Sequence, residues 1–217
     1  MSADKLSLYN DALTLCGERM LSSLTENREP RHLLDQAWAS GAVDFCLETG
    51  QWNFACVSMA FTYSPSVVPP FGYRRAFDKP TDYIRTMAVC TDEYFRQPLL
   101  RYTDEADFWF ADEDLIYIRY VSNLPEYGMN MGRWPGSFAE MVSSYLAAKI
   151  VMKVTQDVAK RVFVAKDYED RRKEAKSNDA MNQPTTFPPR GTWVRSRTAG
   201  RNGYVDDGGF LTGSLTD

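Results

Sequence analysis

The chain of 217 residues contains a single histidine, His32, and this scarcity limits the chemistry available to it. A serine or cysteine nucleophile normally requires a neighbouring base, which is most often a histidine. His32 stands at the start of a helical pattern with no candidate nucleophile beside it, which favours a structural role. The sequence also lacks the HExxH, GxGxxG, GxxxxGK[ST] and EF-hand patterns. We therefore predict no enzyme, no catalytic residue, no metal site and no cofactor.

The sequence has few cysteines and no long uninterrupted apolar run. The four cysteines, of which no two share a CxxC spacing, are Cys16, Cys46, Cys56 and Cys90. Three of them lie inside apolar patterns, which favours buried free thiols in a reducing compartment over disulfides or metal ligands. No charged-then-apolar leader opens the chain. The most apolar run, residues 145–154, is broken by Lys149 and Lys153, so we expect no membrane span.

Composition and length indicate a folded protein that is not a general polyanion binder. Hydrophobic residues make up 44% of the chain and aromatic residues 13%, and the formal net charge is −4. These values are typical of a globular protein, and they oppose non-specific binding to nucleic acid. The length allows one domain with an appendage. We predict an α+β, mainly helical fold: an antiparallel-packed helical bundle with a small antiparallel β-sheet insertion and an extended C-terminal arm.

Helical patterns are expected over residues 4–16, 30–62, 137–154 and 156–181. In the first, Asp4 is a plausible cap and Gly17 a plausible stop. Pro30 suits the first turn of the second, whose end, residues 52–63, continues as helix or as a short extension. The fourth carries acidic and basic residues four positions apart. Its run Arg171-Arg172-Lys173 permits phosphate binding, but the interleaved acids favour an ordinary solvated face.

Residues 65–134 form the predicted β insertion, because repeated prolines exclude a long helix there. Strand-like runs are expected at residues 73–77, 83–89, 99–102, 107–110 and 115–121. Six acids follow the ends and turns of these runs: Asp104, Glu105, Asp107, Asp112, Glu113 and Asp114. A carboxylate pair or a hard-metal site is possible in principle, whereas solvated loops are the favoured interpretation.

Residues 184–217 form the predicted arm, because glycine and proline are frequent there and no helical period is present. Four arginines and three aspartates give this arm a charge of +1, against −5 for residues 1–183. Its candidate partner-binding residues are Phe187, Arg190, Trp193, Arg195, Arg197, Tyr204, Phe210 and Leu211. A solvating linker does not need exposed Trp and Phe, whereas a segment that orders on a partner does. The alternative is a tail packed on its own domain.

A short stretch around Trp52 is the predicted structural pivot of the chain, comprising Gly50, Trp52, Asn53 and Phe54. Gly50 is expected to adopt the left-handed conformation that closes a helix. Trp52 and Phe54 carry large apolar surfaces that must be buried where the chain turns. We expect the flanking helices and the later strands to pack on this stretch.

Several short stretches, taken in order, resemble a known family. They are Asn10-Asp11-Ala12-Leu13 with Leu15-Cys16-Gly17-Glu18; Gly50-Gln51-Trp52-Asn53-Phe54-Ala55; Phe71-Gly72-Tyr73 with Lys79-Pro80-Thr81-Asp82-Tyr83-Ile84-Arg85; Ile118-Arg119-Tyr120-Val121; Phe138 with Tyr145-Leu146-Ala147-Ala148-Lys149-Ile150; and residues 168–180, which end in Asp179-Ala180. Together they span residues 1–182. In this order the chain resembles the tail tubular protein A family, the head-to-tail adaptors of short-tailed phages. Cys16 and Lys79 depart from the family's usual residues.

The resemblance implies a structural virion protein of the tail or neck, made in the host cytoplasm. About twelve copies would form a closed ring whose heterologous contacts repeat around an axis. The ring would bind the portal protein, extend the DNA channel, help to retain the genome and serve as a platform for the tail nozzle or tail-tube protein. Duplex DNA would pass through without specific binding. No catalytic or metal residues carry over from the family.

Two other functions are considered. The arginines of the arm, with Trp193 and Tyr204, resemble the basic-aromatic stretches that bind nucleic acid, although the acidic body opposes this. A hydrolase based on the acids of residues 104–114 ranks last.

Overall fold

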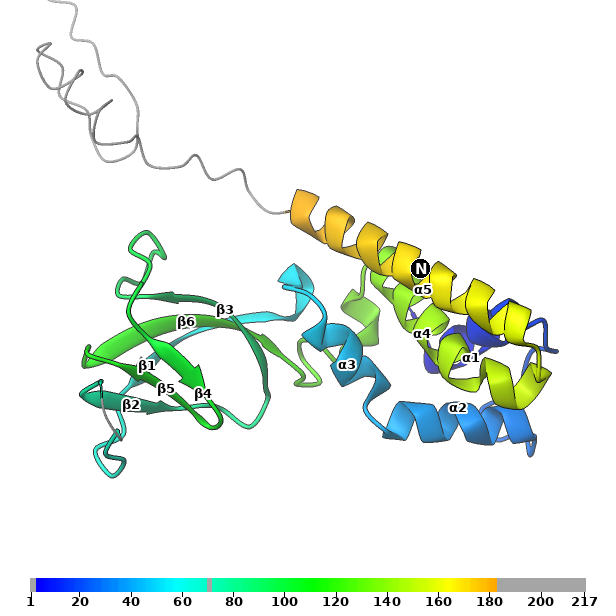
Figure 1. Ribbon diagram of the computed structural model, residues 1–217, viewed down its shortest axis with the longest axis horizontal. Coiled ribbons are helices and arrows are strands. Elements are labelled where there is room, and N and C mark those ends of the chain that lie inside the picture. The colour runs from blue at the N-terminus through cyan, green and yellow to red at the C-terminus, as the bar shows by residue number, and fades with distance from the viewer. Residues whose placement is uncertain (1–2, 70–71, 183–217) are drawn as a thin grey trace, which may run out of the picture. The chain divides into compact units, whose positions relative to one another are not determined.

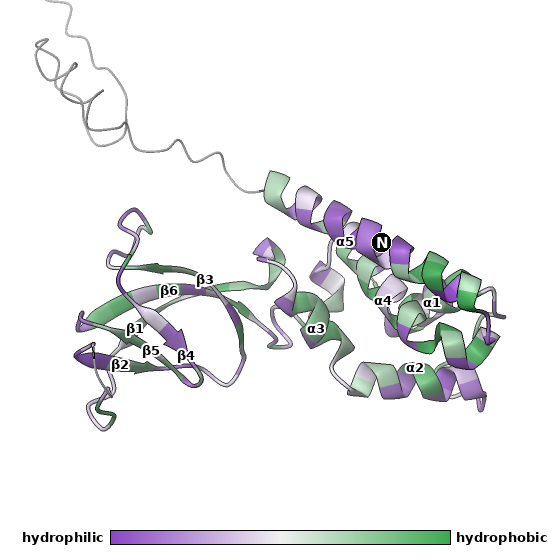
Figure 2. Ribbon diagram, in the orientation of Figure 1, coloured by the Kyte–Doolittle hydropathy of each residue, from purple (hydrophilic) through white to green (hydrophobic). Residues whose placement is uncertain are grey.

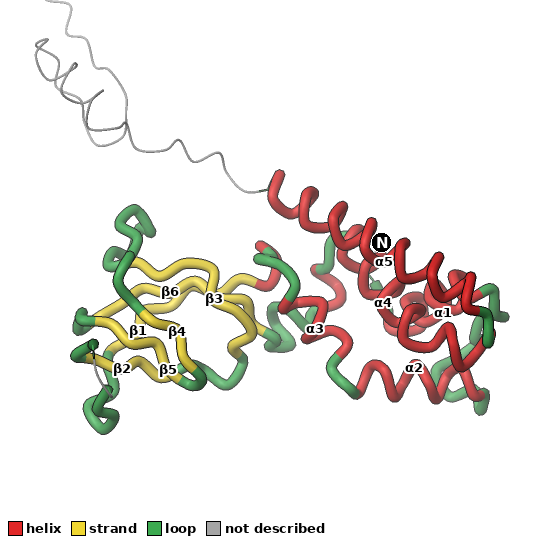
Figure 3. The backbone as a smooth tube through the Cα atoms, in the orientation of Figure 1, coloured by secondary structure: helices red, strands yellow, loops and turns green. Residues whose placement is uncertain are grey.

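A computed structural model describes residues 3–69 and 72–182 of the chain. The chain divides into two units, Met1–Gln183 and Pro184–Asp217, and the described residues belong to the first. They form an α+β fold with five α-helices and two three-stranded antiparallel sheets (Figure 1), which confirms the predicted fold class. In the sequence the strands occupy the middle of the described part, and helices precede and follow them. Figure 3 shows the helices in red and the strands in yellow.

The helices are α1 (Lys5–Cys16), α2 (Glu29–Ala39), α3 (Ala42–Glu48), α4 (Gly136–Thr155) and α5 (Val158–Met181), with short 3₁₀ turns at Asn53–Ala55 and Met131–Arg133. The strands are β1 (Cys56–Thr62), β2 (Arg75–Asp78), β3 (Tyr83–Cys90), β4 (Thr103–Glu105), β5 (Phe108–Ala111) and β6 (Leu115–Ser122).

Helix α4 is the centre of the bundle, because α1, α2, α3 and α5 all contact it. Its buried face includes Phe138, Met141, Val142, Leu146 and Ile150, each at most 2% exposed. These positions recur every three or four residues, so one side of the helix forms a continuous apolar stripe. Figure 2 shows hydrophilic residues along much of α5, which covers α4 and faces solvent on its other side.

The ends of α1 follow the local sequence signals. Asp4 is the N-cap residue, and Ser7 Oγ accepts a hydrogen bond from its backbone N–H at 3.1 Å. Gly17 adopts a left-handed conformation with φ +71°, and its N–H donates to the carbonyls of Leu13 and Thr14. Pro30 lies in the first turn of α2, as predicted. The last helix starts at Val158 because Asp157 caps it and Gln156 adopts a positive φ of 52°.

The predicted helix over residues 30–62 is wrong. The chain forms α2 and α3, separated at Gly41, whose φ of +83° is incompatible with a continuous helix. Residues 56–62 form β1 instead of helix, paired with β6 along its whole length from Cys56↔Val121 to Thr62↔Leu115. The β region therefore begins before residue 65. Residues 56–62 form a strand because they pair with a distant strand, and this pairing outweighs the local apolar spacing that favours helix.

The predicted single sheet is in fact two, with strand orders β1-β6-β3 and β2-β5-β4. Their inward side chains form a second core that includes Phe77, Trp109, Ile116, Ile118 and Tyr120. The predicted strand at residues 99–102 is also wrong. Pro98 forms an isolated bridge with Cys90, Leu99 N–H donates to the carbonyl of Val89, and β4 begins only at Thr103.

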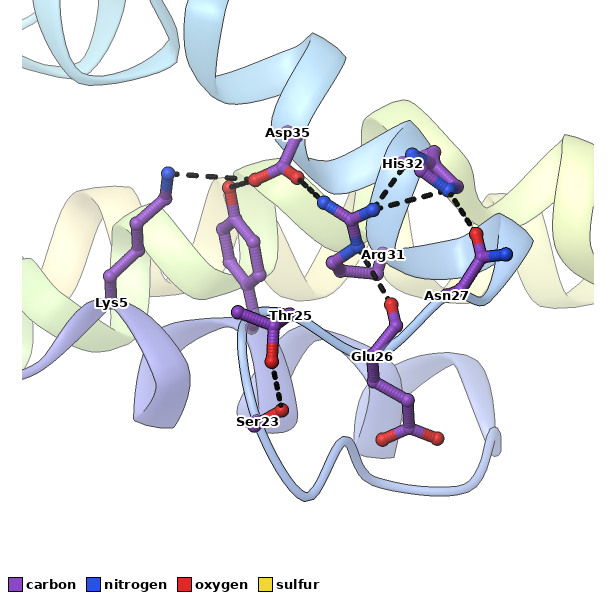
Figure 4. Close-up of polar contacts among 9 residues, drawn as sticks. Lys5, Ser23, Thr25, Glu26, Asn27, Arg31, His32 and Asp35 are labelled. Carbon is purple, nitrogen blue, oxygen red and sulfur yellow. Dashed lines mark hydrogen bonds and ion pairs between the residues drawn. The ribbon is translucent and has the colours of Figure 1, made fainter.

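Figure 4 shows the polar network that joins α1 to α2 around Asp35. The Asp35 carboxylate accepts hydrogen bonds from Tyr9 Oη at 3.0 Å and from Arg31 Nη1 at 2.6 Å, and Lys5 Nζ lies 3.5 Å away. Burial raises the pKa of Tyr9, and the neighbouring carboxylate adds to this. His32 contacts Arg31 and Asn27, so the only histidine belongs to a structural network.

All four cysteines are free thiols, and only Cys56 is half-buried rather than buried. Burial raises the pKa of Cys16 to about 11 and that of Cys46 to about 12, so these thiols stay protonated at neutral pH. In the part of the chain that the structure describes, none of the helices has both the length and the apolarity needed to cross a membrane.

Asp104 connects the two sheets. Its carboxylate forms an ion pair with Lys79 and accepts hydrogen bonds from Thr86 Oγ1 at 2.6 Å and from Trp109 Nε1 at 3.2 Å. Burial acts to raise the pKa of Asp104, but the hydrogen bonds from Lys79 and Thr86 outweigh it and hold that pKa below its ordinary value. Asp104 is therefore a structural ion-pair partner.

We predict that Asp104→Asn lowers the free energy of unfolding at pH 7 by about 1–2 kcal/mol, because it removes a partly screened charged hydrogen-bond network. A depressed folded-state pKa stabilises the fold above the unfolded pKa of about 3.9, and this stabilisation is lost as pH falls through the folded value. Urea unfolding should therefore show the difference from wild type shrinking below about pH 4. Asp107→Asn, at an exposed carboxylate, is the control; equal losses for both variants would contradict the assignment.

Candidate functional site

The stretch predicted as a pivot lies where α3 ends and β1 begins. Trp52 is 1% exposed, and its indole Nε1 donates to the carbonyls of Cys46 and Leu47, each at 3.1 Å. A helix end leaves its last carbonyls without partners inside the helix. The side chain of Trp52 therefore satisfies the end of α3 while it enters the core.

An aromatic cluster connects this stretch to the start of α4. The ring of Phe138 lies 4.9 Å from Trp52, 4.8 Å from Phe54 and 5.0 Å from Trp134, measured between centroids, and all three pairs are edge-to-face. Such pairs contribute about 0.5–1.5 kcal/mol each beyond the area they bury. The chain leaving α3 and the chain entering α4 are thus held together by one cluster.

Gly50 does not adopt the left-handed conformation predicted for it. Among the described glycines only Gly17, Gly41 and Gly72 have positive φ, and α3 ends at Thr49 in a right-handed conformation. Glycine is needed at residue 50 for space instead. A Cβ there would lie 2.7 Å from Trp52 Cε2, closer than side-chain atoms approach one another.

Asn53 and Asp179 join the start of the β region to the end of α5. Asn53 N–H donates to Asp179 Oδ2 at 3.1 Å, and Asn53 Nδ2 donates to the Asp179 carbonyl at 2.9 Å and to Oδ2 at 3.0 Å. Burial raises the pKa of Asp179, although the backbone hydrogen bond from Asn53 opposes the shift. These residues are 126 positions apart in the sequence, so the contact joins two distant segments of the chain.

A pocket of about 330 Å³ lies beside this contact. Its lining residues are Thr49, Gly50, Gln51, Trp52, Arg85, Lys176, Asp179 and Ala180. Arg85, on β3, donates from Nη1 to the carbonyl of Glu48 at 3.1 Å. Arg85 and Lys176 were not predicted as site residues, because they lie far apart in the sequence and no local pattern indicates their proximity.

A second pocket of about 260 Å³ lies against α1, α4 and α5, and its charged residues are Asp11, Glu140 and Arg171. Arg171 is engaged by Glu140 at 2.6 Å and by Asp167 at 2.7 Å. Arg172 and Lys173 pair with Glu169 and Asp170 in the same helix. The run Arg171-Arg172-Lys173 is therefore an ion-paired helix surface, as the interleaved acids predicted.

The six acids of residues 104–114 do not converge on one point. Asp114 pairs with Arg75 at 2.7 Å and Asp112 accepts from Arg74 N–H at 3.1 Å, whereas Asp104 pairs with Lys79. Within residues 3–69 and 72–182 no cluster of three or more His, Cys, Asp or Glu has the arrangement to hold a metal ion.

The predicted arm residues lie outside the described part of the chain: Phe187, Arg190, Trp193, Arg195, Arg197, Tyr204, Phe210 and Leu211. The described site is thus the Trp52 junction, which we define as Gly50, Trp52, Asn53, Phe54 and Asp179 with the adjoining pocket. Comparison with protein-family models and with curated proteins finds no match to this chain.

We predict that Gly50→Ala lowers the free energy of unfolding by about 1–3 kcal/mol, because the added methyl group forces the buried Trp52 ring to move. Gly136→Ala is the matched control, since a Cβ at residue 136 meets no atom within 4 Å. Thermal or urea unfolding of both variants tests this. A stable Gly50→Ala variant with unchanged Trp fluorescence would show that the ring is not constrained as described.

Proposed function

We propose that the protein is a head-to-tail adaptor of a short-tailed phage, assembling as a ring of about twelve copies beneath the portal. In this role it extends the DNA channel, helps to retain the genome until ejection and provides a platform for the tail nozzle. The observation that carries the proposal is that the family-like stretches, far apart in sequence, hold one another in the folded body.

Two contacts illustrate this. Asn53, from the stretch Gly50–Ala55, binds Asp179, from the last stretch. Asp82, from the stretch that includes Lys79 and Pro80, accepts from Tyr120 Oη at 3.2 Å, and Tyr120 belongs to the stretch Ile118–Val121. These contacts support the proposal to the extent that the stretches carrying the resemblance belong to one folded body.

A ring of identical subunits needs two unlike faces that meet. The start of α5 offers one. Val158, Val162 and Phe163 are 65%, 64% and 62% exposed, so three large apolar side chains near the start of α5 face solvent. Val158 and Val162, four residues apart, are neighbours on the helix surface. Arg161 and Lys166 flank them, and neither forms an ion pair within the described residues. We call this apolar and basic surface the α5 stripe.

The outer face of the sheet β2-β5-β4 offers a complementary surface. Asp78 and Glu105 are both direct cross-strand partners of Phe108, one on each side of it. Cross-strand partners project from the same face of a sheet, so two carboxylates flank a half-buried aromatic ring. Neither carboxylate forms an ion pair within the described residues. We call this the acidic row.

The overall charge suits a passage for DNA. Each fixed contact to a phosphate adds affinity and slows movement, and a net charge of −4 opposes general binding to polyanions. Contact between the α5 stripe of one copy and the acidic row of the next would bury unlike charges and apolar surface together. Such complementarity sets which faces meet and how fast they associate.

Binding to the portal tests the proposed function. Purified full-length chain is mixed with portal rings and with portal rings lacking their lower surface, and the mass of each mixture is measured. We expect about twelve added copies on the intact portal and none on the truncated one. Failure to bind the intact portal would contradict the adaptor function.

Charge exchange tests the subunit contact separately. We expect Arg161→Glu with Lys166→Glu to weaken ring assembly on the portal about tenfold or more, and added Asp78→Lys with Glu105→Lys to restore it. Arg172→Glu, on the same helix but paired with Glu169, is the control. A zero-length carboxyl–amine cross-linker should join Lys166 of one copy to Glu105 or Asp78 of an isotopically labelled second copy. Rings that form equally well with the double reversal would refute this contact and leave the adaptor function standing.

A further inference from the structure

We propose that the pocket beside Trp52 binds a phosphate group through Arg85 and Lys176. The two cations approach it from different elements, Arg85 from β3 and Lys176 from α5, and both line the same cavity of about 330 Å³. This site is separate from the faces assigned to the subunit contact and does not depend on the adaptor function.

The two cations of this pocket form no ion pair with any described residue, although the Asp179 carboxylate lines the pocket and Glu169 acts on Lys176 from the same helix. Lys176 Nζ has no hydrogen bond or ion pair with any residue of the described ranges. Burial lowers the pKa of Lys176, and the nearby guanidinium groups of Arg172 and Arg85 lower it further. Positive charges held close together repel one another, and a bound anion relieves this repulsion.

Arg85 is oriented at the pocket and has N–H donors that are not used within the described part of the protein. Its Nη1 donates to the carbonyl of Glu48 at the end of α3, which orients the guanidinium. Arginine has five N–H donors in a planar fork that matches phosphate geometry, so most of them remain for a ligand. Lys176 adds a mobile point charge with three donors. Together these groups suit an anion with several acceptor oxygens.

The carboxylate on the pocket wall is already engaged. Asp179 lines the same cavity, but its oxygens accept hydrogen bonds from the backbone and the side-chain amide of Asn53. It forms no ion pair with Lys176, although the two are three residues apart in one helix. Asp179 therefore supports the wall of the pocket through Asn53 and forms no ion pair with either cation.

The pocket suits a single phosphate group better than a long polyanion. It is an open hollow of about 330 Å³, and both Arg85 and Lys176 are exposed at it. An extended nucleic-acid contact requires a continuous basic track, whereas Arg171, Arg172 and Lys173 on the same helix are all paired with acids. A free ion and a nucleic-acid strand end or backbone both supply such a phosphate, and the test distinguishes these sources.

Phosphate titration of the full-length protein tests the site. Inorganic phosphate is added at low chloride, and the Lys176 side-chain nitrogen and the Trp52 indole are followed by NMR. We expect saturable shifts, a rise in the pKa of Lys176, and affinity reduced about tenfold or more in Arg85→Gln and in Lys176→Gln, because each removes a charged contact. Lys173→Gln, exposed and paired with Asp170, is the matched control and should bind as wild type.

A short DNA duplex carrying a terminal phosphate, with its unphosphorylated counterpart, forms the second arm. If the duplex binds, if inorganic phosphate displaces it and if Arg85→Gln abolishes this binding, the site is assigned to nucleic-acid phosphate. If only inorganic phosphate binds, the site is assigned to the free ion. Both outcomes support the site. The absence of a saturable shift up to about 20 mM phosphate would overturn the proposal. Equal phosphate affinity in wild type and in both site variants, when the variants unfold at the same temperature as wild type, would also overturn it.

Discussion

The contact between Asn53 and Asp179 is the constraint on which the described structure most depends. It fixes the point where the helical segment turns into the first strand against the last turns of α5. A buried carboxylate is costly unless its oxygens accept hydrogen bonds, and Asn53 supplies them from its backbone and its side chain. Trp52, the preceding residue, enters the core and satisfies the end of α3. Two consecutive residues thus position α3, β1 and α5 together.

This junction explains how one body contains two hydrophobic cores. The bundle core is centred on α4, and Phe138 at its start packs against Trp52 and Phe54. The second core lies between the two sheets, where Trp109 and Tyr120 are buried. Asp82 joins Tyr120 and Ser122 within the β region, with hydrogen bonds of 3.2 and 2.5 Å. Each core thus has a buried carboxylate at its edge, Asp179 or Asp82, whose hydrogen-bond partners lie far away in the sequence.

Local signals in the sequence were sufficient for some elements and not for others. Asp4 and Gly17 define α1 because capping depends on neighbouring residues. The strand β1 was missed because its stability comes from pairing with β6, about sixty residues later, and no local spacing records that partner. Gly50 was predicted to matter because of a positive φ, but the turn requires glycine there to leave space for the ring of Trp52. Arg85 and Lys176 were overlooked because only the folded chain brings β3 and α5 to one pocket.

Native-state hydrogen exchange on an Asp179→Ala variant tests the role of the junction most directly. If the contact couples the elements, protection should fall together in the last turns of α5, at Trp52 and Asn53, and at the start of β1, by a similar free energy at each of these sites. Loss of protection confined to the end of α5, with Trp52 and β1 protected as in wild type, would contradict the account, because it would show that the helical bundle and the β region are held together elsewhere.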